Sequence, residues 1–317
     1  MIAKQSHVIA KGDALKQSGL LLAMAGAIAF SGKAIIVKLS YLHGVDAVTV
    51  IMLRMLFSLP LFLALAWWAS NRPHARANPL NRRDVLAIMG LGFLGYYLAS
   101  FLDFLGLQFI TASLERLIIY LNPTLVMLLS ALIYKHRLHR MRLWAMAISY
   151  GGVLLVFAHE VSLAGAGVVK GSALVLASAI SYALYLMFSG QMVQRIGAMR
   201  LVGLASSVAC VLAIAQFVVL RPISSMAVPE EVLYLALLNA TACTVAPVLL
   251  IMLAIERIGA SLTAQVGMIG PMSTVSLGVL VLGEPLNAWI GLGTLLVLGG
   301  VYMASKHGDG NGLRHQG

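Results

Sequence analysis

Charged residues are scarce in this chain. Only 10% of its 317 residues are Asp, Glu, Lys or Arg, whereas 60% are hydrophobic and the mean hydropathy is +0.93. A water-soluble fold would have too little polar surface, so the composition excludes a soluble globular protein. Strand-like alternation of apolar and polar residues is also missing. This excludes a closed barrel and leaves α-helices as the structure that satisfies its backbone hydrogen bonds within a membrane.

Residues that usually carry catalysis are missing or poorly placed. All eight histidines fall in predicted loops or tails, and the pair His136 and His139 has no nearby acid or cysteine to complete a metal site. The chain contains no phosphate-binding loop and no serine-nucleophile motif. The two cysteines, Cys210 and Cys243, lie within apolar segments, which is typical of small buried residues rather than of a disulfide. The sequence therefore predicts no enzyme, no cofactor and no metal.

What the chain has instead is a series of apolar stretches, each about as long as the roughly 20 residues that cross a bilayer as a helix. The predicted spans are 18–40, 47–69, 85–107, 111–134, 142–158, 168–189, 200–221, 230–254, 261–282 and 286–304. We therefore predict an all-α membrane protein with ten transmembrane helices and short tails at 1–17 and 305–317. A count of nine stays open, because 142–158 is short and two other spans contain prolines.

Basic residues are distributed asymmetrically between the connections. With the N-terminus in the cytoplasm, the cytoplasmic segments hold 16 of the 22 Lys and Arg residues, and the outward connections hold only Lys170 and Arg221. The asymmetry follows the positive-inside rule and predicts that both termini are cytoplasmic. The net charge of +11 then indicates the lipid bilayer as a partner and no nucleic acid, because there is no soluble basic patch interleaved with aromatics.

The chain also contains an internal repeat. At a shift of 148 residues, 110–114 (Ile-Thr-Ala-Ser-Leu) align with 258–262 (Ile-Gly-Ala-Ser-Leu) and Pro123 aligns with Pro271, with 12 identities in the 49 positions from 105 to 153. Spans one and six correspond at a shift of 152. The prediction is two five-helix halves, 18–158 and 168–304. Because five crossings reverse the orientation, the halves must be inverted, an arrangement typical of alternating-access transporters.

Several short motifs resemble the EamA family of the drug/metabolite transporter superfamily. They are Ala112-Ser-Leu with Leu121-Asn-Pro123, their counterparts Ala260-Ser-Leu and Gly270-Pro271, then Leu280-Val-Leu-Gly-Glu284-Pro-Leu, Gly299-Gly300 and Met52-Leu-Arg54. The chain departs from the family pattern at Lys135-His136, where Gly-Glu is usual. The resemblance implies a ten-helix exporter of amino acids or related small metabolites in the bacterial inner (plasma) membrane.

Ionisable residues within spans are candidates for a gate. They are Lys33, Arg54, Asp103, Glu115 and Arg116, all in the first half and all predicted at one depth, in the outer third of the membrane. The alternative is a static ion-pair cluster, or snorkelling to the headgroups. Three cations against two anions leave one cation unmatched, which would suit a carboxylate or phosphate on a substrate.

A second set of candidates forms the predicted substrate path. It consists of polar, aromatic and proline residues away from the span ends: Tyr96, Tyr120, Asn122, Pro123, Tyr182, Asn239, Gln265 and Pro271. The duplicated prolines predict paired helix breaks on spans four and nine. Hydrogen bonding between helices is the competing explanation for the polar members.

The leading hypothesis is a secondary transporter that exports a small-molecule substrate by alternating access. The alternative is an integral-membrane enzyme or a flippase acting on lipid-linked substrates, with a channel third. The glycine runs at 151–152 and 291–300 predict close helix contacts, either within the chain or in a homodimer.

Overall fold

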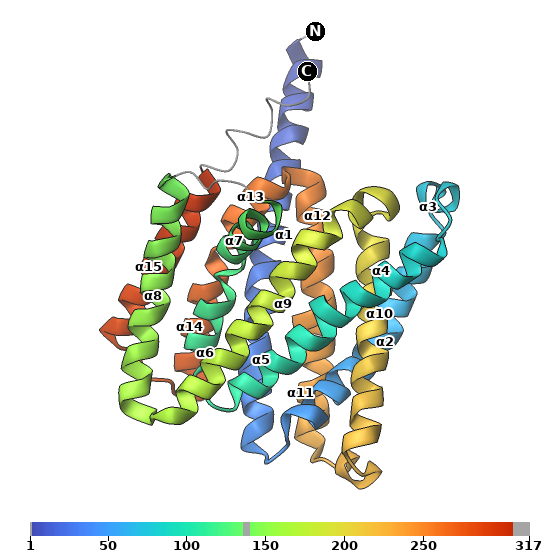
Figure 1. Ribbon diagram of the computed structural model, residues 1–317. Coiled ribbons are helices and arrows are strands. Elements are labelled where there is room, and N and C mark those ends of the chain that lie inside the picture. The colour runs from blue at the N-terminus through green and yellow to red at the C-terminus, as the bar shows by residue number, and fades with distance from the viewer. Residues whose placement is uncertain (1, 136–139, 307–317) are drawn as a thin grey trace.

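The computed structural model describes residues 2–135 and 140–306. Within these residues every regular element is a helix (Figure 1). The first half contains α1 (Ile2–Leu42), α2 (Ala47–Ser70), α3 (Pro73–Ala77), α4 (Arg82–Gly92), the π-helical turn η1 (Phe93–Leu98), α5 (Ala99–Leu107), α6 (Ala112–Ile119), α7 (Asn122–Tyr134) and α8 (Arg140–Ala164). The second half contains α9 (Ala166–Ile196), α10 (Ala198–Leu220), the 3-10 turn η2 (Ile223–Met226), α11 (Glu230–Ala240), the π-helical turn η3 (Thr241–Val245), α12 (Ala246–Ile258), α13 (Ala260–Val266), α14 (Ile269–Leu282) and α15 (Ala288–Lys306).

Eight helical segments in the described residues are long and apolar enough to cross a membrane, and two shorter apolar helices, Ile269–Leu282 and Ala288–Met303, follow them. The protein is thus an all-helical, multi-pass membrane protein. Helix α1 begins on the side of the molecule where α15 ends, and α9 runs in the opposite direction to α1 (Figure 1). Helix α1 begins at Ile2, so residues 2–17 of the expected tail at 1–17 belong to the first helix.

The repeat seen in the sequence is also present in the secondary structure. At the shift of 148 residues, α4 falls on α11, η1 falls on η3, and the pair α6 and α7 falls on the pair α13 and α14. Each of these pairs breaks just before the duplicated proline motif, because proline supplies no backbone donor to the preceding turn. A π-turn inserts one residue into a helix and is frequent at functional sites. Its duplication at equivalent positions shows that both halves preserve the same irregularity.

Helices from the two halves pack against their own counterparts at the edges of the bundle. Helix α2 packs along α10 at one edge, and α8 packs along α15 at the other (Figure 1). In the middle, α1 packs on α12, and its counterpart α9 packs on α5. Helix α5 is the counterpart of α12, so the two contacts are equivalent, as a two-fold relation between the halves requires.

Glycines allow the close approach of α8 and α15. A Cβ at Gly300 would lie 2.5 Å from the backbone oxygen of Ala145, and one at Gly152 would lie 2.7 Å from that of Gly293. These glycines of the two runs therefore serve contacts within the chain. No described neighbour lies within 4 Å of a Cβ built on Gly151, so this glycine has no such role.

The segment 159–167, which lies between the predicted spans 142–158 and 168–189, is not a loop. Helix α8 continues to Ala164, and α9 begins at Ala166, with only Gly165 (φ 72°) between them. Two polar residues of this segment bind neighbouring elements. Glu160 accepts hydrogen bonds from the Thr111 backbone and hydroxyl, and His159 Nε2 lies 2.9 Å from Asn287 Nδ2.

Candidate functional site

A cavity of about 340 Å3 lies between the two halves of the bundle. Helices α1, α2 and α5, the turn η1 and the break between α6 and α7 line it from the first half; α9, α10, η3 and α12 line it from the second. Most of its lining is apolar, with a few hydroxyl, amide and charged groups. A volume near the lower end of ordinary ligand sites fits a small molecule.

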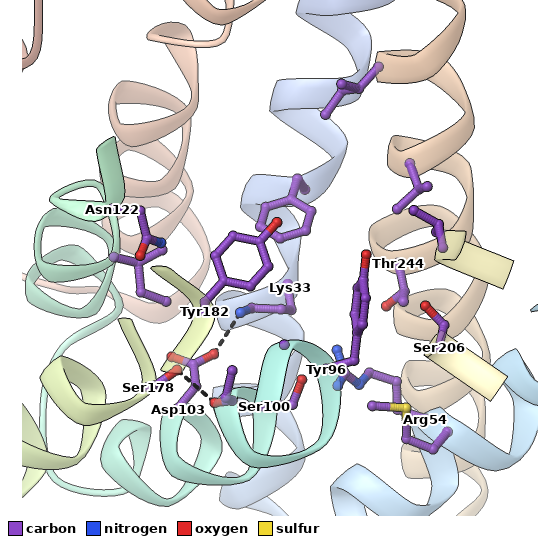
Figure 2. A pocket seen from close by; sticks show the side chains of 18 of the residues that line it. Lys33, Arg54, Tyr96, Ser100, Asp103, Asn122, Ser178, Tyr182, Ser206 and Thr244 are labelled. Atoms are coloured by element: carbon purple, nitrogen blue, oxygen red, sulfur yellow. Dashed lines mark hydrogen bonds and ion pairs between the residues drawn. The ribbon is translucent and has the colours of Figure 1, made fainter. Parts of the chain in front are cut away.

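Equivalent positions of the two halves contribute to the lining of this cavity. At the shift of 152, Phe30 corresponds to Tyr182, and at the shift of 148, Tyr96 corresponds to Thr244. All four residues line the cavity. Figure 2 shows the rings of Tyr96 and Tyr182 on opposite sides of it, with Ser206 and Thr244 on the side of Tyr96. The cavity therefore lies where the relation between the repeats predicts a substrate path.

The π-turn η1 is what places Tyr96 in the wall. Ser181 Oγ on α9 donates a hydrogen bond to the Leu94 carbonyl at 2.8 Å, and the Tyr96 and Tyr185 hydroxyls are 3.1 Å apart. Gly95 permits this approach, because a Cβ there would lie 2.3 Å from the Tyr185 ring. In η3, the Thr244 hydroxyl donates to the Asn239 carbonyl five residues earlier, at 2.8 Å. Both π-turns thus present a side chain to the cavity from a fixed backbone.

Charged side chains form one end of the cavity. Lys33 Nζ lies 2.6 Å from Asp103 Oδ2 and 3.7 Å from Glu115 Oε1, so one ammonium faces two carboxylates (Figure 2 shows the first pair). Glu115 is fully buried and neither of its oxygens accepts a hydrogen bond within the described residues. Arg54 Cζ lies 4.6 Å from the centroid of the Phe104 ring, and Lys33 Nζ lies 5.9 Å from the same centroid. These groups form one cluster, and their common depth in the membrane stays a prediction.

Arg116 is the fifth member, and it faces a different neighbour. Its Nη2 donates to Ser31 Oγ at 3.3 Å, and that hydroxyl in turn donates to the Gly270 carbonyl at 2.8 Å. Gly270 opens α14 in the second half, at the position equivalent to Asn122. Arg116 therefore connects α6 through α1 to the second helix break, behind the cavity wall rather than in it.

The residues expected along the path divide into two groups. Tyr96, Asn122 and Tyr182 line the cavity, as do Lys33, Arg54 and Asp103 from the charged set. The remaining path residues do not contribute to its lining: Tyr120, Pro123, Asn239, Gln265 and Pro271. Pro123 and Gln265 are exposed, whereas Asn239 and Pro271 are buried outside the cavity.

Sequence reasoning missed some lining residues, notably Phe30 and Ser206. Phe30 could have been found by applying the shift of 152 to Tyr182, because equivalent positions share a face in each half. Ser206 lies in the seventh span, to which that shift does not apply. No group of three His, Cys, Asp or Glu side chains that could hold a metal occurs in the part of the chain that the structure describes. The pair His136 and His139 lies outside that part.

An acidic residue of the second half binds the first half beyond the charged cluster. Glu284, in the connection between α14 and α15, accepts hydrogen bonds from the backbone of Ala112 (2.7 Å) and Ser113 (3.2 Å) and from the Ser113 hydroxyl (2.7 Å). The carboxylate thus caps the N-terminus of α6, where it also interacts favourably with the helix dipole. Glu284 belongs to the Gly-Glu-Pro motif whose first-half counterpart is Lys135-His136.

Comparisons with known proteins agree with this architecture. Residues 17–158 and 169–306 each match the EamA-like transporter family. A protein of Bacillus subtilis (strain 168) named uncharacterized transporter YcbK is 28% identical over 292 residues, which is 90% of each chain. One solved crystal structure resembles the fold with a TM-score of 0.60 at 18% sequence identity, covering 95% of this chain and 99% of the other.

Proposed function

The chain belongs to the EamA-like transporter family, and from that premise we propose that it is a secondary transporter that exports small amphiphilic metabolites by alternating access. We propose ten crossings in two inverted halves. Helix α14 is the second part of the ninth crossing, and α15 is the tenth crossing. The distribution of Lys and Arg supports a plasma-membrane (bacterial inner membrane) protein with both termini cytoplasmic.

One observation carries this proposal: the cavity is built from equivalent positions of the two repeats. Its lining extends towards the side of the chain ends, where it includes Val202 in the second turn of α10 and Met252 in the middle of α12. Towards the opposite side it ends at Arg54 and Asp103, behind which lies a buried apolar cluster that includes Ile51. The arrangement supports a substrate path that is closed on the outer side and loaded from the cytoplasm.

An exporter needs a site that exchanges its access between the two sides of the membrane. Short helices and breaks on α6–α7 and α13–α14 provide flexible points in both halves, because their ends lack the continuous hydrogen bonds of a helix interior. The partners in this proposal are a small-molecule substrate and the lipid bilayer. A homodimer stays a prediction.

The proposal is tested by efflux from proteoliposomes. Purified protein is reconstituted in vesicles loaded with a labelled pool of amino acids and other small metabolites, and released solutes are identified by mass spectrometry. We expect release of one or a few related compounds, reduced at least tenfold by Arg54→Ala. The matched control Arg83→Ala removes an exposed arginine at the start of α4 and should not change release. If no solute is released while a lipid-linked compound is modified, the enzyme alternative replaces the transporter.

A further inference from the structure

The Arg54 guanidinium has no ionic partner in the described residues. Its side chain is buried, with 4% of the residue exposed, and it forms no ion pair there. Two of its three nitrogens, Nε and Nη2, also lack a hydrogen-bond partner. A buried charge within a membrane costs at least about 2.5 kcal/mol when it is unpaired. An arginine kept in this position therefore calls for a counter-ion that the protein itself does not supply.

The other charges at the cavity do not neutralise Arg54. Asp103 is the only carboxylate among the described lining residues, and Lys33 already binds it at 2.6 Å. Lys33 is itself shared with Glu115 at 3.7 Å, so that ammonium faces two acids. The lining residues on α10, Val202 and Ser206, add no charge. Among the described lining residues two cations stand against one carboxylate. With Glu115 included the four charges balance in number, and Arg54 is the member without an ion-pair partner.

The rest of the cavity is suited to an apolar body. Phe30, Phe62, Tyr96 and Tyr182 contribute aromatic rings to a space of about 340 Å3. In Figure 2 the Arg54 side chain extends from α2 to a place next to the Tyr96 ring. A ligand with its anionic head at Arg54 would therefore have its apolar part between aromatic walls.

We propose that the cavity takes small amphiphilic monocarboxylates and that Arg54 binds their carboxylate. This inference rests on the proposed function and names its substrate class. Nε and Nη2 form one edge of the guanidinium, and two nitrogens on one edge match the two oxygens of a carboxylate in a bidentate pair. Both nitrogens are buried in this state, so binding requires the side chains that cover this edge to move aside. A phosphate monoester dianion would bring a second negative charge with no free cation to meet it. An organic cation would be repelled by the positive charge of Arg54.

The test compares head groups on one apolar body. Binding of 3-phenylpropanoate, 3-phenylpropyl phosphate and 3-phenylpropylamine to the purified full chain in detergent is measured by isothermal titration calorimetry. We expect the carboxylate to bind at least tenfold more tightly than the phosphate and the amine. Equal or tighter binding of either of the latter, or no binding of the carboxylate, overturns the proposal. This comparison uses the unmodified protein and does not depend on the folding of any variant.

Variants then locate the head group. Arg54→Gln should weaken carboxylate binding at least tenfold, and Arg54→Lys should weaken it less, because lysine keeps the charge but not the fork. Arg83→Gln, at an exposed position, should leave the affinity unchanged. Unchanged affinity in Arg54→Gln overturns the assignment. Because binding is measured without transport, a bound carboxylate that is not released from proteoliposomes would overturn only the exporter function.

Discussion

Substitution of Glu284 tests whether the contact between the two halves controls access from the outer side. Glu284 is buried, with 9% of the residue exposed, and its carboxylate accepts three hydrogen bonds from Ala112 and Ser113. In the proposed orientation this contact lies on the outer side, between the second half and the N-terminus of α6. In the proposed alternating-access mechanism, opening of that side would separate these elements, and the bonds would then exist only in the outer-closed state.

The size of the effect follows from these bonds. A hydrogen bond to a charged group contributes about 1.5–3 kcal/mol, and a carboxylate at a helix N-terminus adds about 0.3–1 kcal/mol. Glutamine keeps one acceptor oxygen but loses the charge and turns an NH2 group towards backbone donors. We therefore expect Glu284→Gln to cost the outer-closed state about 2–3 kcal/mol, which shifts the equilibrium roughly 30- to 150-fold towards the outer-open state.

The assay measures the distance between two spin labels by double electron–electron resonance. With the buried Cys210 and Cys243 replaced by alanine, labels are attached at the exposed positions Gln108, at the end of α5, and Leu286, in the connection that carries Glu284. We expect a longer-distance population to appear in Glu284→Gln.

A matched control and a defined failure complete this test. Glu231→Gln makes the same chemical change at an exposed residue of α11 and should leave the distances unchanged. If Glu284→Gln lowers the unfolding temperature but leaves the label distances as in the parent protein, the carboxylate is a static cap and the reasoning is refuted.

Three further predictions concern other parts of the chain. Lys135 has a left-handed backbone (φ 55°), as does its counterpart Gly283 (φ 67°). Lys135→Gly should therefore stabilise the protein by up to about 1 kcal/mol in thermal unfolding. A loss of stability would contradict this prediction. Glu115→Gln should increase labelling at the outer side, because the buried cluster loses one of its two acids; unchanged accessibility would make the cluster a static scaffold. Burial alone would raise the pKa of Asp46, but a backbone N–H and Arg221, whose Nε is 2.5 Å away, hold the pKa below its ordinary 3.8. This pair therefore stabilises the fold above about pH 4, and the stabilisation is lost as the pH falls further. Asp46→Asn should lower the unfolding temperature at pH 7 and not at pH 3. The effect is at most about 1 kcal/mol, because both side chains are about a third exposed.

The sequence predicted the repeat, the helical class and the two helix breaks, because each of these depends on strong local signals. Apolar runs report burial in the membrane, and Pro123 and Pro271 fix where a helix interior ends. The contact of Lys33 with Asp103 and Glu115 agrees with their predicted common depth, since residues at one depth on neighbouring helices have few alternatives to pairing.

Other features depend on the direction in which a side chain points from its helix, and a sequence pattern does not contain this information. The π-turns η1 and η3 each insert a residue without any change in hydropathy, and this rotates the following turn relative to the rest of the helix. Gln265 and Tyr120 are adjacent to helix breaks, where the helical period no longer tells which face a side chain occupies. The predicted span 142–158 ended before His159 and Glu160, but both residues lie within the continuous helix α8 and bind partners from other elements.

The differences between equivalent positions bear on how the protein works. The shared backbone keeps two similar halves, yet Arg54 is in the first half, and the described lining residues of the second half carry no charge. Likewise, Glu284 caps α6, whereas Gly259 at the N-cap of α13 provides no side-chain cap. The residue equivalent to Glu284 is His136. In the proposed orientation the outer contact is therefore held by a carboxylate that the cytoplasmic counterpart lacks. Such an imbalance favours the state that is closed outside and open to the cytoplasm, which is the state an exporter must occupy while it waits for its substrate.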